Sequence, residues 1–280
     1  MGVSFMSNVP YIWSNWTGPS GLTYYDEQSV KWLWGFIQNG ICVDPNGNTL
    51  NCGQISNNAM QGLFGNLYQE SHCCPFELQG WETQYQRCWD YVNDYSRQTR
   101  TAYAFTQETY GGGTKGFGLA QWTEASRKEG LWNYAPTLSG VVKNHNWLGD
   151  LERDANYLLY DLYTFDMRSS ANRQLWDSQT RTVWEWLSDP NVSVYDAVNA
   201  VLMIYERPFE TTPTYSEWNN EYNLRSGYAP KVNQDMTGVL PPTPPTPPTP
   251  PTTGIPIYQM FYLTDKNKYT NKKVFEKEGE

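Results

Sequence analysis

The segment MQGLFGNLYQES, residues 60–71, decides the fold class. Four of its apolar residues recur at i, i+3, i+4 and i+7, the spacing of one face of an α-helix: Met60, Leu63, Phe64 and Leu67. The pattern predicts a buried helix over residues 56–70. Glu70 follows Leu67 by three residues and therefore falls on the same side of the helix as the apolar face.

Glu70 has the properties of a general acid at this position. Loss of water favours the neutral form of a carboxyl group, and the negative end of the helix dipole has the same effect. A carboxyl group whose pKa is raised in this way can protonate a glycosidic oxygen near neutral pH. The spacing alone leaves open the alternative that Glu70 is an exposed residue of a final turn.

Further apolar stripes at helical spacing indicate that the chain is mainly α. The predicted helices are residues 29–38, 151–165, 173–187 and a segment that begins at Ser193 and is ended by Pro208. Between residues 77 and 118 the chain is polar, aromatic and Gly-rich, which is typical of hairpins or long loops. We therefore expect a helical body with a small lobe of β-hairpins and loops beside a cleft.

The run PPTPPTPPTPP, residues 241–251, marks the clearest domain boundary because it adopts an extended polyproline II arm and cannot join a packed core. The predicted parts are an N-terminal extension, a catalytic domain, a Pro/Thr-rich linker and a C-terminal docking tail: residues 1–27, 28–240, 241–253 and 254–280.

Composition excludes several classes of partner. The formal net charge of −9 argues against nucleic acid and anionic membranes, which require a basic surface. No stretch is long and apolar enough for membrane insertion, and the first residues do not form a secretory signal. The 13 Trp, 21 Tyr and 10 Phe suit stacking on sugar rings, or simply the filling of core positions.

The five cysteines do not have the paired spacing of a zinc site, so we expect neither a bound metal nor a cofactor. Cys42 and Cys52 flank the turn-rich sequence DPNGN. A disulfide that closes this loop is expected if the protein meets an oxidising environment.

The segment KGFGLAQWT, residues 115–123, is the second candidate for chemistry. Gly116 and Gly118 would let the backbone approach a ligand closely, while Gln121 and Trp122 offer amide and stacking contacts. The alternative is a glycine-containing turn that enters a strand.

The motifs GNLYQES, GFGLAQWT and IYERP, in this order over residues 56–208, resemble those of the phage tail lysozyme domain. The resemblance implies a lysozyme-like α+β fold and makes Glu70 the catalytic acid. It places the second motif along the sugar-binding cleft and the third at the end of a helix behind the site. The substrate-binding residues that it implies are Gly116, Gly118, Gln121, Trp122, Thr123 and Tyr205.

A glycosidase commonly uses a second carboxylate as nucleophile or base. Glu108 and Glu124, on either side of the second motif, are the candidates by position, together with Asp90 and Asp94. Glu206 of the third motif is interpreted instead as a structural partner of Arg207.

The resemblance implies a virion-associated muramidase or lytic transglycosylase. Such an enzyme is made in the host cytoplasm, is carried on the phage tail tip and cleaves the MurNAc–GlcNAc bond of peptidoglycan so that DNA can enter. The C-terminal tail is expected to bind other phage tail proteins. Two alternatives remain: a glycan-binding tail-tip or knob protein without catalysis, and an amidase that uses Cys73 or Cys74 with His145.

Overall fold

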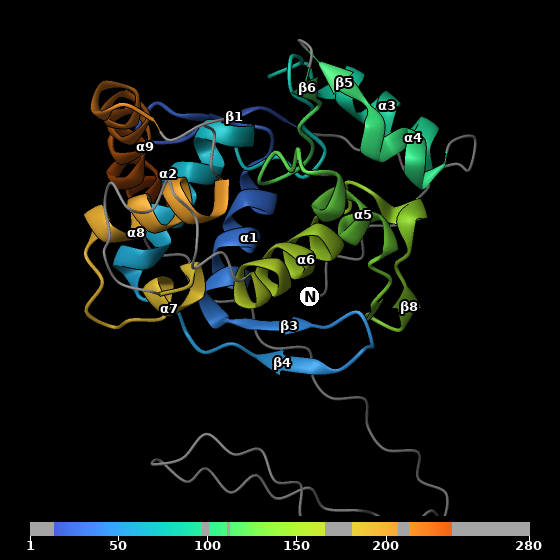
Figure 1. The fold of residues 1–280 in the computed structure, drawn as a ribbon, viewed down its shortest axis with the longest axis horizontal. Coiled ribbons are helices and arrows are strands. Elements are labelled where there is room, and N and C mark those ends of the chain that lie inside the picture. Colours follow the sequence, from blue (N-terminus) through green and yellow to red (C-terminus); the bar gives the residue numbers. More distant parts are fainter. Residues whose placement is uncertain (1–13, 97–100, 111–112, 166–180, 207–212, 237–280) are drawn as a thin grey trace, which may run out of the picture. The chain divides into compact units, whose positions relative to one another are not determined.

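The computed structural model describes residues 14–96, 101–110, 113–165, 181–206 and 213–236. The chain divides into two compact units, Met1–Thr243 and Pro244–Glu280, and all described residues belong to the first. The described part is mainly helical with short two-stranded antiparallel sheets, which confirms the predicted fold class (Figure 1). The linker and the docking tail lie outside the described residues, so the domain boundaries stay predictions. Among the described helices, none combines the length and apolarity needed to cross a membrane.

The predicted helices around the Glu70 motif are confirmed, and their ends have clear causes. Helix α1 (Glu27–Asn39) begins after Asp26, whose side chain accepts from the Ser29 N–H, and ends at the left-handed residue Gly40. Helix α2 (Asn57–Ser71) begins after Ser56, whose side chain accepts from the Ala59 N–H. Both helices contribute buried apolar residues to the common core.

Two later helices also follow the prediction, and one is shorter. Helix α6 (Leu151–Thr164) and helix α8 (Val194–Ala200) begin where expected. Beyond α8 the chain continues as a π-helix, η3 (Val201–Glu206). The described part of the segment expected at residues 173–187 is α7 (Val183–Leu187), which begins only after the extended cap residue Thr182.

The expectation of loops between residues 77 and 118 is wrong in part. This region contains α3 (Tyr85–Ser96) and α4 (Ala102–Gln107), followed by a hairpin. Two further helices, α5 (Ala125–Asn133) and α9 (Tyr215–Met236), were not predicted. Charged residues, Arg225 and Asp235, occupy buried positions of α9 and interrupt the apolar pattern that would have revealed it.

The short elements are four hairpins and one 3-10 turn in the described part of the chain. The turn is η1 (His145–Trp147). The strands pair β1 with β2, β3 with β4, β5 with β6 and β7 with β8: Trp16–Thr17, Thr23–Tyr24, Ile41–Val43, Thr49–Asn51, Thr109–Tyr110, Gly113–Thr114, Thr137–Leu138 and Val141–Val142.

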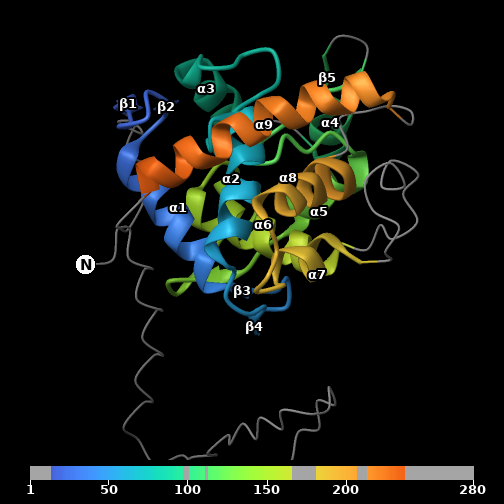
Figure 2. The same cartoon turned by 90° about the vertical axis from the view of Figure 1, so that its left-hand side faces the viewer.

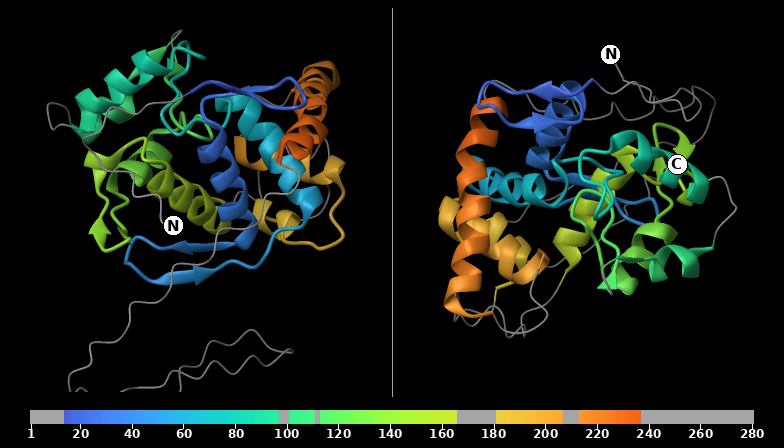
Figure 3. Two further views of the ribbon diagram at one scale, coloured as in Figure 1. Left: turned by 180° about the vertical axis from the view of Figure 1, so that it is seen from behind. Right: turned by 90° about the horizontal axis from the view of Figure 1, so that it is seen from above.

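Helix α2 is held between α8 and α9, and two glycines allow this close approach (Figure 2). A Cβ on Gly62 would lie 2.4 Å from the Ala197 Cβ in α8, and one on Gly65 would lie 2.6 Å from the carbonyl oxygen of Arg225 in α9. The buried Asn66 amide then donates to the Val198 carbonyl oxygen over 3.2 Å. Figure 3 shows that α9 and the α3–α5 region lie on opposite sides of α2 and α6. The packing thus brings the last turn of α2 against α9.

The hairpin β3–β4 places the two cysteines of the predicted loop side by side. The Cys42 and Cys52 Sγ atoms are 3.9 Å apart, and both side chains are buried. Incubation with glutathione disulfide is expected to join them, with two molecules of glutathione as the reduced product. The bond should stabilise the fold by roughly 2 to 3 kcal/mol because it closes a short loop in the unfolded chain.

Intact mass and thermal unfolding measure this effect. Oxidation of the wild type should remove two hydrogen atoms and raise the melting temperature by several degrees. Cys42→Ser is the control, since it keeps the other thiols and should show no oxidative gain. A wild type that stays fully reduced at these two positions would contradict the prediction.

Candidate active site around Glu70

Glu70 lies in the last turn of α2, one residue before the helix ends. Its side chain retains 18% exposure, so it is neither sealed in the core nor free in solvent. Glu70 Oε1 accepts a hydrogen bond from Arg225 Nη2 of α9. The other terminal nitrogen of Arg225 donates to Glu221 Oε2, and the guanidinium, only 2% exposed, therefore joins two carboxyl groups from two helices.

The surroundings of Glu70 raise its pKa. Burial is the main cause, and the negative charge of Glu221 acts in the same direction, while the charge and hydrogen bond of Arg225 oppose both. The direction agrees with the expectation from the sequence. A carboxyl group in this position holds its proton to a higher pH than an exposed glutamic acid.

A second carboxyl group, Glu206, lies within electrostatic reach of Glu70. Its Oε1 is buried and has no hydrogen-bond partner among the described residues. Burial and then the negative charge of Glu70 raise the pKa of Glu206 well above its ordinary value, against the opposing charges of Arg127 and Arg225. Glu206 is the last residue of the π-helix η3, a geometry that is rare and frequent at functional sites.

Asp161 of α6 anchors the end of η3. Its Oδ2 accepts from the Tyr205 hydroxyl over 2.7 Å, from Arg127 Nη2 over 2.8 Å and from Trp122 Nε1 over 3.2 Å. Arg127 Nη1 also donates to the carbonyl oxygen of Tyr205 over 3.1 Å. Because Tyr205 immediately precedes Glu206, this network fixes the position of the second carboxyl group.

The second motif packs against the end of α2. Ser71 Oγ, next to Glu70, donates to the Leu119 carbonyl oxygen over 2.8 Å. Gly118 has a left-handed φ of 75°, and a Cβ there would lie 3.1 Å from the Trp122 ring. A Cβ on Gly116 would lie 2.8 Å from Gln121 Oε1. The close approach that the glycines permit is therefore to the protein's own side chains.

Sugar stacking was predicted for Trp122 of this motif and sugar contact for Tyr205 of the third motif, and both predictions need correction. Trp122 and Tyr205 are fully buried, so neither ring offers a face on which a sugar could stack. Both side chains donate instead to Asp161 Oδ2. Gln121 is half-buried and donates to the carbonyl oxygens of Glu77 and Gly118, while Thr123 is exposed. Sugar binding by Gln121 and Thr123 stays a prediction.

The structure brings neither Glu108 nor Glu124 into the group of charges that acts on Glu70. Glu124 is exposed at the N-terminal cap of α5. Glu108 follows α4, where its charge acts on Lys115 and Lys128. Asp90 is exposed and accepts from Gln86 over 2.8 Å, and the Asp94 side chain lies outside the described residues.

The cysteine-dependent alternative receives no support from the geometry. Cys73 and Cys74 are fully buried, and burial raises the pKa of both thiols. A nucleophilic cysteine requires the opposite shift. His145 stacks on Trp132 at 4.7 Å, while the imidazole near these cysteines, His72, faces Glu77 at 3.3 Å.

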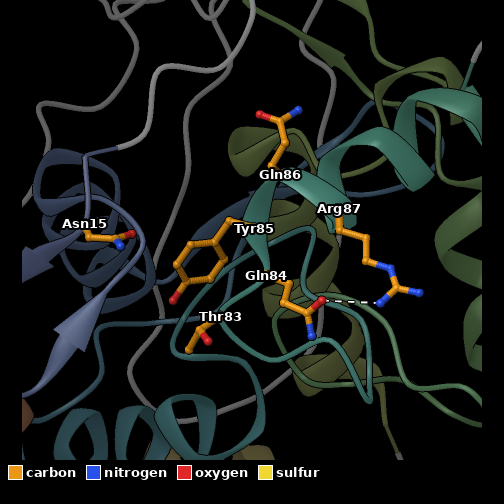
Figure 4. Close-up of a pocket in the computed structure, with 6 residues that line it drawn as sticks. All are labelled: Asn15, Thr83, Gln84, Tyr85, Gln86 and Arg87. Carbon is orange, nitrogen blue, oxygen red and sulfur yellow. Dashed lines mark hydrogen bonds between the residues drawn. The ribbon is translucent and has the colours of Figure 1, made fainter.

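An open hollow of about 500 Å³ lies at the start of α3 (Figure 4). Its lining residues are Asn15, Thr83, Gln84, Tyr85, Gln86 and Arg87. No carboxylate is among them, and Arg87 is held by Gln84 over 3.3 Å. The hollow therefore lacks the pair of carboxyl groups that a glycosidase commonly uses.

The sequence pointed to Glu70 but not to the charged residues that the structure places around it and around Glu206. Arg225 lies in the helix that was not predicted, and Asp161 lies in a predicted helix without any motif to mark it. Glu206 was interpreted as a partner of Arg207, which lies outside the described residues. The third motif offered a weak signal, because a carboxylate that ends an apolar helical run is costly to bury unless it is paired or protonated.

Comparison with known proteins finds a family model that covers this region. The family model described as phage tail lysozyme matches residues 48–236, about two thirds of the chain. The match includes the elements that carry Glu70, Asp161, Glu206 and Arg225. No curated protein and no solved structure matches the chain. The chain belongs to the phage tail lysozyme family.

Proposed function

We propose that this protein is a virion-associated glycosidase that cleaves the MurNAc–GlcNAc bond of peptidoglycan and so opens the host wall for phage DNA. Family membership supports the substrate class, and the Glu70 region supports the chemistry. The single observation that carries the proposal is the proximity of two carboxyl groups with raised pKa values, Glu70 and Glu206.

Glu70 is the general acid in this mechanism. It gives its proton to the glycosidic oxygen as the bond to the sugar breaks, and the carboxylate that remains is stabilised by the Arg225 guanidinium already in contact with it. Glu206 is the second carboxylate, and in its ionised form it accepts the proton of the water, or of the sugar's own hydroxyl group in a transglycosylase, whose oxygen forms the new bond to the sugar carbon. The negative charge of one carboxylate opposes the ionisation of the other, so the pair is expected to lose its two protons in separate steps.

The remaining residues position this pair. Asp161, Arg127 and Tyr205 hold the end of η3, and Ser71 joins α2 to the second motif. We further propose that residues 254–280 attach the enzyme to other tail proteins at the virion tip.

Mass spectrometry of digested peptidoglycan tests the function. Purified, protein-free sacculi incubated with the full chain should release muropeptides that end in reducing MurNAc, or in anhydro-MurNAc for a transglycosylase route. Sacculi that bind the protein without being cut would support the glycan-binding alternative. Products cleaved at an amide bond would contradict a glycosidase and favour the amidase.

A further inference from the structure

Aromatic side chains form a continuous surface along the N-terminal half of α9 and the adjoining turn of α8. Consecutive ring centroids are 5.3 Å, 5.7 Å and 5.2 Å apart. We name this surface the aromatic stripe, and its members in order are Tyr215, Trp218, Tyr222 and Tyr195. Figure 2 shows α8 lying along this half of α9.

The stripe is exposed and pre-ordered. Tyr215 is 73% exposed and Tyr195 is 43% exposed, while Trp218 and Tyr222 are half-buried. Trp218 Nε1 donates to Asn199 Oδ1 over 2.8 Å, which fixes the central ring. Single exposed aromatic residues are ordinary on a protein surface, but a contiguous group that is already ordered marks a binding surface, because little side-chain entropy is lost on binding.

The part of the aromatic stripe on α9 lies on the face of this helix that also carries Arg225, the residue in contact with Glu70. Trp218, Tyr222 and Arg225 are spaced at i, i+4 and i+7 and so share one face of α9. Tyr215 lies ten residues before Arg225, which corresponds to roughly 15 Å along the helix axis. Arg225 in turn contacts Glu70. A linear ligand could therefore lie along α9 with one part at Glu70.

We propose that the aromatic stripe binds sugar rings of a peptidoglycan glycan strand at a distance from the bond that is cut. This inference rests on the proposed function, since the ligand is its substrate. Sugar rings have apolar faces that pack on aromatic rings and hydroxyl groups that donate to nearby acceptors. The carboxylates beside the stripe, Glu217 and Asp196, supply acceptors and disfavour an anionic partner such as nucleic acid.

Binding is measured apart from catalysis, by cosedimentation of the full-length Glu70→Gln chain with purified, protein-free sacculi. In this background Tyr215→Ala and Tyr195→Ala are each expected to weaken binding about 3- to 10-fold, and the double variant more. Trp218 is left unchanged because its ring also packs against α8.

Two control variants test whether the loss of any exposed tyrosine weakens binding to sacculi, or only the loss of those in the aromatic stripe. Tyr103→Ala removes a ring that is 76% exposed, and Tyr163→Ala removes one that is 43% exposed and packs edge-on against Trp184. Both should bind as the background does. The proposal is overturned if the background does not sediment with sacculi, if the stripe variants bind unchanged, or if the controls lose as much. None of these outcomes depends on cleavage, so a protein that binds through the stripe without cutting would overturn the proposed function alone.

Discussion

Glu70→Gln is expected to lower the rate of peptidoglycan cleavage by about 10²- to 10⁴-fold, the range typical of losing a general acid. Glutamine has the shape of the protonated acid and can still accept from Arg225, so it removes the transferable proton and little else. The measurement is the initial rate of muropeptide release from sacculi, together with thermal unfolding to show that the fold is retained.

Glu129→Gln is the matched control for this variant. Glu129 is an exposed glutamate of α5, and the substitution should leave the rate unchanged. If Glu70→Gln kept more than about a tenth of the wild-type rate while melting normally, Glu70 would not be the acid. If the wild type itself showed no cleavage but bound sacculi, the non-catalytic alternative would be favoured.

The fold was predictable where apolar spacing is regular and caps are clear. Helix α2 shows both, with Ser56 at its start and a buried face that includes Leu63 and Leu67. Helix α9 has a capping box at its start, formed by Thr214 and Glu217, but its apolar spacing is interrupted by Arg225 and Asp235. The buried carboxylate of Asp235 is satisfied by hydrogen bonds, since it accepts from the Ser20 hydroxyl and from the Tyr24 hydroxyl. Such long-range polar contacts cannot be obtained from the spacing along one segment.

The site was predictable only as far as one residue could be placed on one helix. Glu70 follows from the phase of α2 and from the family motif. Glu206 depends on the turn geometry of η3, because a π-helix rotates the residues that follow it relative to the α-helical pattern of α8. Trp122 shows the opposite error. Its residue type suggested sugar stacking, but the ring is buried and its Nε1 donates to Asp161.

Glu206→Gln is expected to move the basic limb of the pH–rate profile to lower pH and to lower the maximal rate. In the wild type, the Glu70–Glu206 pair carries one negative charge after its first proton is lost. This charge opposes the loss of the second proton. Glutamine carries no charge, so Glu70 then titrates without that repulsion and loses its proton at a lower pH. Glu206→Asp is the rescue, because it restores the charge and should return the limb toward the wild-type position.

The melting temperature of Glu206→Gln distinguishes coupled ionisation with Glu70 from a purely structural role for Glu206. A structural role would make the variant less stable than the wild type, whereas coupled ionisation would not. The folded-state pKa of Glu206 is raised by burial and by Glu70, so its protonated form stabilises the fold fully below the unfolded pKa. That contribution is lost as the pH rises through the folded-state value. Glu206→Gln removes the dependence, so its melting temperature should fall less steeply with pH and should not be lower than wild type near neutral pH. A large drop in melting temperature, with a pH–rate profile of unchanged shape, would show that Glu206 supports the fold and does not affect the ionisation of Glu70.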